Sequence, residues 1–296
     1  MCRHVAYLGP PATLRSVLID PPHGLYRQAW APRRMRHGTV NADGFGVGWY
    51  ADGDPVPARY RRAVPIWADE SLPDIARVTR SAAVLAAVRN ATEGMAAGER
   101  AAAPFASGPW LFSHNGALAG WPASAAAVAE AAGTPAAALL SLEATVDSAF
   151  LWALALERLR AGRPMAAALT ETIDAVETAN PAGAAGAVGR FNFLLTDGRS
   201  IAATACGDTL WYRRGSDCVV VASEPGDDEP GWTEVPDRHL LTATASLVSV
   251  RPLAARRDPV PSLASPTSPT SPTSPTSPTS PTAATVPSAP KGSITR

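Results

Sequence analysis

The chain has 296 residues, of which 46% are hydrophobic, enough to bury a substantial core. Its 26 basic and 26 acidic side chains cancel, and no basic block occurs, so the sequence has no electrostatic footprint for nucleic acid. No apolar run approaches the roughly 18 residues of a membrane span, and the start lacks the apolar segment of a secretory signal. We therefore expect a cytoplasmic protein of one large domain or two small ones, with no membrane partner.

The three cysteines are Cys2, Cys206 and Cys218. Their number is odd and no CxxC pair occurs, so neither a disulfide framework nor a zinc site is indicated. Cys206 and Cys218 are most simply small core residues. The sequence implies no metal and no organic cofactor.

Cys2 combines two reactive groups if Met1 is removed. A free thiol has a pKa of about 8.5 and an α-amine one of about 7.7 to 8.0, so the amine of an N-terminal cysteine is available to take the thiol's proton. The run from Val5 to Leu8 predicts a short buried strand that would hold this terminus. Cysteine at position 2 is weak support by itself, and the downstream motifs decide its interpretation.

The first third of the chain predicts short strands and helices. The expected elements are a helical turn at 13–19, a glycine-rich strand in 41–50, a strand at 59–66, a helix at 71–79 and an apolar strand at 81–89. The glycines of 41–50 do not have GxGxxG spacing, and no lysine follows as in a P-loop. Several polar residues before and within this stretch have a site, turn or surface role that the sequence leaves open, namely Arg34, Arg36, His37, Asn41 and Asp43.

Two apolar strands end in polar motifs. The first runs out into residues 89–94, Arg-Asn-Ala-Thr-Glu-Gly, and the second is 109–118, which breaks at Asn115-Gly116. Asn-Gly is first of all a turn signal, so the simplest prediction is a hairpin there. His114 either orients this turn or is buried structure.

The second half predicts helices and then strands. Residues 123–160 are helical, with an interruption at 133–135 where Thr134 would cap the next helix, and 164–178 form another helix. Asp147, within an apolar stretch, is either a cap or a site residue. Four strand-like runs follow as a meander, at 191–196, 200–205, 209–212 and 218–223. This order predicts an α+β fold with two sheets and helices packed outside.

Residues 258–296 form a tail beyond the folded domain at 2–257. Ser-Pro-Thr repeats six times in 265–282, a composition that buries no apolar surface and predicts disorder with polyproline II character. A solvated tail is the simpler interpretation, and a docking or phosphorylation segment is the alternative.

Four motifs in this order resemble class II glutamine amidotransferase domains, which are N-terminal nucleophile hydrolases: Cys2, 89–94, 114–116 and 145–148. The resemblance covers about residues 2 to 255 and implies a four-layer αββα sandwich. It implies that Cys2 is the nucleophile with its own α-amine as base. The Asn115 side-chain amide and the Gly116 N–H would form the oxyanion hole.

The resemblance also assigns the substrate's glutamyl end. Arg89 would bind its α-carboxylate, with Thr92 in support, and Asp147 would bind its α-ammonium. Many family members have Gly after the catalytic Cys and an aromatic-Ala-Thr-His-Gly run after the Arg, whereas Arg3, Asn90 and Glu93 stand here. Several segments resemble a standalone branch, the γ-glutamyl hercynylcysteine sulfoxide amidohydrolases of ergothioneine biosynthesis: 1–9, 41–50, 222–225 and 231–232.

That branch removes glutamate from a γ-glutamyl conjugate. A rival interpretation is a glutaminase subunit that passes ammonia to a separate synthase, and a third is a noncatalytic binding module on the same fold. The implied substrate carries a trimethylammonium group, which an aromatic face binds; Trp30 and Trp49 are candidates, although core or surface packing explains each more simply. The sequence does not decide between a monomer and a homo-oligomer.

Overall fold

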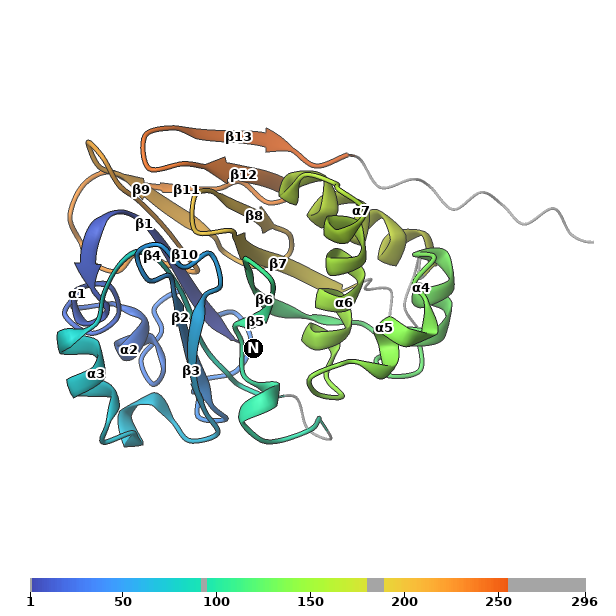
Figure 1. Ribbon diagram of the computed structural model, residues 1–296, viewed down its shortest axis with the longest axis horizontal. Coiled ribbons are helices and arrows are strands. Elements are labelled where there is room, and N and C mark those ends of the chain that lie inside the picture. The colour runs from blue at the N-terminus through green and yellow to red at the C-terminus, as the bar shows by residue number, and fades with distance from the viewer. Residues whose placement is uncertain (1, 92–94, 180–188, 255–296) are drawn as a thin grey trace, which may run out of the picture. The chain divides into compact units, whose positions relative to one another are not determined.

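Two antiparallel sheets lie at the centre of the fold (Figure 1). The computed structural model describes residues 2–91, 95–179 and 189–254. The seven-stranded sheet has the order β11-β9-β10-β1-β4-β2-β3, and the six-stranded sheet has the order β13-β12-β8-β7-β6-β5. The strands are β1 (Arg3–Thr13), β2 (Phe45–Trp49), β3 (Ala58–Arg62), β4 (Arg80–Val88), β5 (Phe105–Ser107), β6 (Trp110–Leu118), β7 (Gly189–Thr196), β8 (Ile201–Ala205), β9 (Trp211–Arg214), β10 (Val219–Ala222), β11 (Trp232–Glu234), β12 (His239–Ala243) and β13 (Val248–Pro252).

Helices cover the outer face of each sheet (Figure 1). They are α1 (Leu14–Leu18), α2 (Leu25–Gln28), α3 (Leu72–Val78), α4 (Ala125–Ala131), α5 (Ala136–Leu140), α6 (Asp147–Arg160) and α7 (Met165–Ala179), with short 3-10 turns at Ile66–Ala68 and Glu99–Ala101. One apolar cluster joins α1–α3 to the seven-stranded sheet, a second joins α4–α7 to the six-stranded sheet, and a third fills the space between the sheets. This four-layer αββα arrangement confirms the predicted fold class.

Strand β1 is buried on both faces, which explains its uninterrupted apolar run. Ala6 and Leu8 pack between the sheets, and Val5 packs toward α1 and α2. The strand lies between β4 and β10, with Arg3 opposite Val88 and Val5 opposite Ala222. The N-terminus therefore enters the middle of a sheet and is fixed on both sides.

The predicted hairpin at Asn115-Gly116 is wrong. β6 continues through both residues, with Asn115 opposite Asn192 and Gly116 opposite Phe191 on β7. A Cβ at position 116 would overlap the carbonyl oxygen of Arg190. The glycine is therefore required by close approach of the neighbouring strand, and not by a turn.

Two other local predictions are also wrong. The four runs after residue 190 are not one meander, because β7 and β8 pair in the six-stranded sheet whereas β9 and β10 pair in the other. Thr134 does not cap α5: its buried hydroxyl has no partner among the described residues, and Pro135 occupies the N-cap position. Sequence spacing alone does not specify which sheet a hairpin joins.

Some predictions fall on residues that the structure does not describe. The tail at 258–296, Met1, Thr92 and Glu93 all lie outside the described residues. Within the described part of the chain, no helix is both long and apolar enough to cross a membrane.

Candidate active site

Cys2 immediately precedes β1 and lies close to the three other motifs predicted to form the site. Because Arg3 pairs with Val88, the register places Cys2 beside Arg89 at the end of β4. Cys2, Arg89, Gly116 and Asp147 line one pocket, and so do His114 and Ser148. The fold thus brings together four motifs that are far apart in the sequence.

Backbone carbonyls orient the side chain of Arg89, which is only 7% exposed. Its Nη2 donates to the carbonyl of Ala96 at 2.8 Å, and its Nη1 donates to that of Asp43 at 3.4 Å. Asp43 in turn donates its N–H to the carbonyl of Arg89 and accepts from the N–H of Ala91 through its carboxylate. Asp43, whose role the sequence left open, therefore supports the Arg89 segment.

Asp147 is the first residue of α6 and is 4% exposed. Its Oδ2 accepts from the N–H of Leu118 at 3.0 Å, and its Oδ1 accepts from the N–H of Ser148 at 2.7 Å. A helix N-terminus favours a negative charge at this position. Of the two roles that the sequence left open, Asp147 does not have the cap role, because Val146 holds the N-cap position; it lines the pocket instead.

Asn115 and Asn192 differ sharply in hydrogen bonding, although they are opposite each other and neither is exposed to solvent. Asn192 donates to the carbonyls of Asp208 and Thr209 and accepts from the N–H groups of Cys206 and Asp208. Neither amide atom of Asn115 has a partner among the described residues. A buried amide without partners is rare, which points to a functional use.

His114 supports the pocket from the helical side of β6. Its Nε2 lies 2.9 Å from the carbonyl oxygen of Arg190, so Nε2 carries the proton, and Nδ1 accepts from the hydroxyl of Ser148 at 3.0 Å. Burial lowers the pKa of His114, which keeps the ring neutral. This arrangement fixes the ring behind Gly116 and Asp147.

A second buried histidine, His4, lies on β1 two residues after Cys2. Its Nδ1 lies 3.2 Å from the hydroxyl of Ser113, whereas its Nε2 has no partner among the described residues. Burial, together with His114 and Arg3, lowers the pKa of His4 to about 3. His4, Ser113 and Asn192 were not among the residues predicted from the sequence. Polar residues within otherwise apolar strands are the signal that could have found them.

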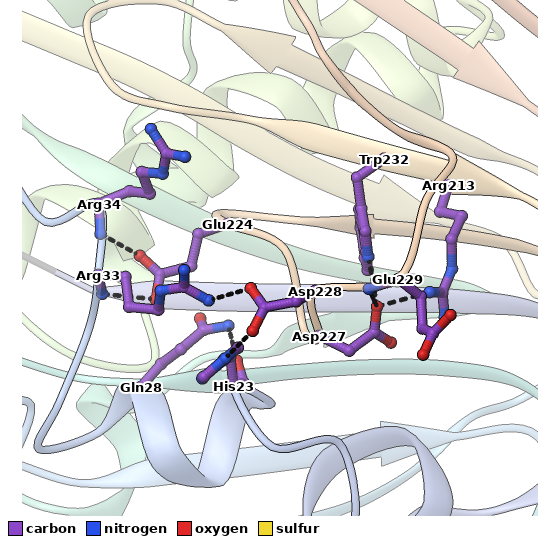
Figure 2. A network of polar contacts seen from close by, with 10 residues as sticks. All are labelled: His23, Gln28, Arg33, Arg34, Arg213, Glu224, Asp227, Asp228, Glu229 and Trp232. Carbon is purple, nitrogen blue, oxygen red and sulfur yellow. Dashed lines mark hydrogen bonds and ion pairs between the residues drawn. The ribbon is translucent and has the colours of Figure 1, made fainter.

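Glu224, at the end of β10, fixes the segment after α2. It is 1% exposed, and its two oxygens accept from the N–H groups of Arg33 at 2.9 Å and Arg34 at 2.6 Å (Figure 2). The side chains of Arg33 and His23 both bind Asp228, which reinforces the same segment. In the sequence, Glu224 stood out only as part of a segment that resembles the family. Its role as an anchor could not be predicted there, because it depends on contacts with residues distant in the sequence.

The two candidate aromatic residues do not form an open face near Cys2. Arg27 lies over the ring of Trp30 at 5.2 Å, where a bound cation would sit. Trp49 pairs with Val84 on β4, whereas Phe45 pairs with Val88 at the end of β4 where Cys2 lies. The two pairs are four residues apart along the strand, so Trp49 lies about 13 Å from that end. Among the described residues, no cluster of His, Cys, Asp and Glu side chains is arranged to hold a metal ion.

Comparisons with known proteins agree with this geometry. Residues 25–216 match the family described as glutamine amidotransferases class-II. The chain belongs to the class II glutamine amidotransferases. It is 43% identical over 255 residues to the gamma-glutamyl-hercynylcysteine sulfoxide hydrolase of Mycolicibacterium smegmatis, covering 86% of this chain and all of that one. The protein of the same name from Mycobacterium tuberculosis is 40% identical over 262 residues, 88% of this chain and all of that one.

More distant members share the fold. A probable glutamine amidotransferase of Saccharomyces cerevisiae is 26% identical, covering 86% of this chain and 84% of that one. The structure of a glutamine aminotransferase class-II domain protein from Silicibacter pomeroyi has a TM-score of 0.63 at 26% identity, covering 86% of this chain and all of that one. Glutamine phosphoribosylpyrophosphate amidotransferase of Bacillus subtilis has a TM-score of 0.55 at 16% identity over 86% of this chain and 49% of that one, a likeness of fold alone.

Proposed function

We propose that the protein is an amidohydrolase that removes glutamate from a γ-glutamyl conjugate through a thioester on Cys2. The observation that carries this proposal is the convergence of Cys2, Arg89 and Asp147 on one pocket, which the chain neighbours of Asn115 also line; the buried Asn115 amide has no partner among the described residues. A glutamyl end carries a carboxylate and an ammonium, to which an arginine fork and a facing carboxylate are complementary.

The conjugate that we propose is γ-glutamyl hercynylcysteine sulfoxide, as in ergothioneine biosynthesis. The mycobacterial relatives of that name, at 40% and 43% identity, support this choice. We place the reaction in the cytoplasm, which is consistent with the free thiols of all three cysteines.

The first half of the reaction forms the thioester. After removal of Met1, the Cys2 α-amine takes the thiol proton, and the thiolate attacks the γ-glutamyl carbonyl carbon. The Asn115 amide and the Gly116 N–H stabilise the resulting oxyanion, each such donor contributing typically about 2.7 to 4 kcal/mol. The Cys2 ammonium then protonates the leaving nitrogen, the C–N bond breaks, and the amine departs.

The second half releases glutamate. The α-amine accepts a proton from water, whose oxygen attacks the thioester carbonyl. The same oxyanion donors stabilise the new tetrahedral intermediate. The C–S bond breaks, the sulfur regains its proton from the ammonium, and glutamate leaves with a free γ-carboxyl group, which loses its remaining proton to solvent.

The test is glutamate release by the purified protein from γ-glutamyl hercynylcysteine sulfoxide and from glutamine, with Cys2→Ala as control. We expect release from the conjugate to exceed that from glutamine by far and to vanish in the variant. A variant as active as the parent would remove Cys2 as the nucleophile.

Membership of a glutamine amidotransferase family favours one alternative, a glutaminase subunit that delivers ammonia to a separate synthase. This function predicts that glutamine is the better substrate and that a second protein stimulates its hydrolysis. The same assay therefore separates the two functions.

A further inference from the structure

If the proposed function holds, the amine that the reaction releases binds on the side of Cys2 that faces away from Arg89. β1 lies between β4 and β10, so Arg89 flanks Cys2 on one side only. On the other side, Ser223 exchanges hydrogen bonds with His4, and the register places Glu224 opposite Arg3. If the glutamyl end occupies the Arg89 side, the departing amine faces the residues near Glu224.

A segment of the chain, residues 33–38, arches over this end of the sheet. At its start, the N–H groups of Arg33 and Arg34 donate to Glu224, beyond β10 (Figure 2). At its end, Gly38 lies against Asn90, beyond β4, so closely that a Cβ on Gly38 would overlap the Asn90 amide. The arch therefore spans the ends of the two strands that flank Cys2.

Arg36, near the middle of the arch, is an exposed cation. Its side chain makes no ion pair and no hydrogen bond with the described residues. It lies near Arg3, whose pKa its like charge lowers, and because it has no fixed partner among the described residues it is free to bind an anion that enters beneath the arch.

Arg3 is fully buried, and none of its three guanidinium nitrogens has a hydrogen-bond partner among the described residues. The carboxylates within its electrostatic range are those of Glu224 and Asp208. Glu224 is occupied by backbone N–H groups, and Asp208 binds Arg190 through one oxygen, leaving the other unpartnered. A buried cation without hydrogen bonds is costly, and Arg36 adds a like charge nearby.

We propose that Arg36 and Arg3 bind a carboxylate on the leaving amine and thereby select γ-glutamyl amides of amino acids over glutamine. Such an amide carries a carboxylate one carbon away from the scissile nitrogen, whereas ammonia released from glutamine carries none. Two arginines that face one anion provide charge-assisted hydrogen bonds, which are the strong class in proteins. Arg3 and Arg36 are thus specificity-determining residues for the leaving half.

A competing role for Arg3 is stabilisation of the Cys2 thiolate, since Cys2 also lies within its electrostatic range. That role would affect every substrate equally, because each passes through the same thiolate. Binding of the leaving group affects only substrates that carry the carboxylate. The two roles therefore separate in a comparison of matched substrates.

The experiment compares γ-glutamylalanine with γ-glutamylethylamide, which differ only in that carboxylate. We expect the parent's kcat/KM to favour γ-glutamylalanine by about 10- to 100-fold, the range of one or two charge-assisted hydrogen bonds. Arg36→Gln should reduce this ratio about tenfold, Arg36→Lys should retain part of it, and Arg3→Gln should reduce it further. Arg77→Gln, which removes an exposed cation on α3, is the matched control and should leave the ratio unchanged.

A ratio that is unchanged in Arg36→Gln overturns the inference, and this variant decides the matter because its side chain is exposed and its loss does not threaten folding. An equal loss on both substrates in Arg3→Gln assigns that residue to the thiolate instead. If the parent protein hydrolyses γ-glutamyl hercynylcysteine sulfoxide but not γ-glutamylalanine, this inference is overturned and the proposed function stands. No glutamate release from any γ-glutamyl amide overturns the proposed function as well.

Discussion

The cross-strand neighbours Asn115 and Asn192 show two uses of the same buried amide. Asn192 has two donated and two accepted hydrogen bonds, and it holds the chain reversal after β8 in place. Asn115 has none among the described residues, although it is equally buried. We propose that its donors bind a charge that develops only during reaction, whereas those of Asn192 are committed to structure. Under this proposal, hydrogen bonding separates the two asparagines where burial and residue type do not.

Apart from the loss of the nucleophile in Cys2→Ala, the largest effect on activity is expected for Asn115→Ala. The variant should lose about 10²- to 10³-fold in kcat, the usual effect of removing one oxyanion donor. Its thermal midpoint should stay close to the parent's, because the Asn115 side chain has no hydrogen bond to the described residues that could be lost. Unchanged kcat would show that Asn115 is not part of the oxyanion hole. Steady-state kinetics and thermal unfolding on the same preparation measure both quantities.

Asn192→Ala is the reciprocal change. It leaves buried N–H groups and carbonyls of residues 206–209 without partners, so the free energy of unfolding should fall by about 2 to 4 kcal/mol. The kcat of the folded fraction should fall far less than in Asn115→Ala. Urea denaturation of the two variants measures the difference. Equal stabilities would contradict the division of roles.

Arg89 is intermediate, because two of its guanidinium nitrogens donate to backbone carbonyls while it lines the pocket. Arg89→Lys keeps the charge but loses the planar fork, so KM for the γ-glutamyl substrate should rise by about 10- to 100-fold, with a smaller change in kcat. Arg77→Lys on α3 is the matched control. A change in kcat alone would instead indicate that Arg89 acts on the reacting atoms.

The two buried histidines give the smallest effect. Burial lowers the pKa of both, that of His4 to about 3, so below pH 6.5 the unfolded chain binds protons that the folded one excludes. The free energy of unfolding should therefore fall as the pH decreases below about 6.5, by about 1 kcal/mol per pH unit for each histidine that stays neutral in the folded chain. His4→Gln should flatten this slope by one histidine's share in urea titrations at pH 7, 6 and 5. Identical slopes would mean that His4 does not titrate on unfolding.

Local pattern was enough to predict the elements that build the scaffold. The apolar run at 81–89 became β4, the segments at 71–79 and 164–178 became α3 and α7, and the succession of strands, helices and strands indicated two covered sheets. These features depend on periodicity and composition within a short window, which the sequence displays directly. The motif residues Cys2, Arg89, Gly116 and Asp147 line one pocket, and their catalytic and binding roles are part of the proposed function.

What the sequence did not predict depends on contacts between distant segments. Asn-Gly predicted a turn, but the approach of β7 makes it part of a straight strand. Arg3 stood out only as a departure from the family's pattern, and its burial without partners became visible only once Glu224 and Asp208 were placed around it. The anchoring of 33–34 by Glu224 joins residues about 190 positions apart, a pairing that no short pattern encodes.

The direct junction between Cys2 and β1 places a constraint on how the chain must begin. Cys2 immediately precedes Arg3, the first residue of β1, and the register places it beside Arg89, while each extended residue advances the chain by about 3.3 Å. One residue inserted between Cys2 and Arg3 would therefore move the thiol from its place beside Arg89, even with the strand and its neighbours intact. The length of chain between the proposed nucleophile and the strand is therefore as important as the nucleophile itself, and a tag for purification belongs at the other end of the protein.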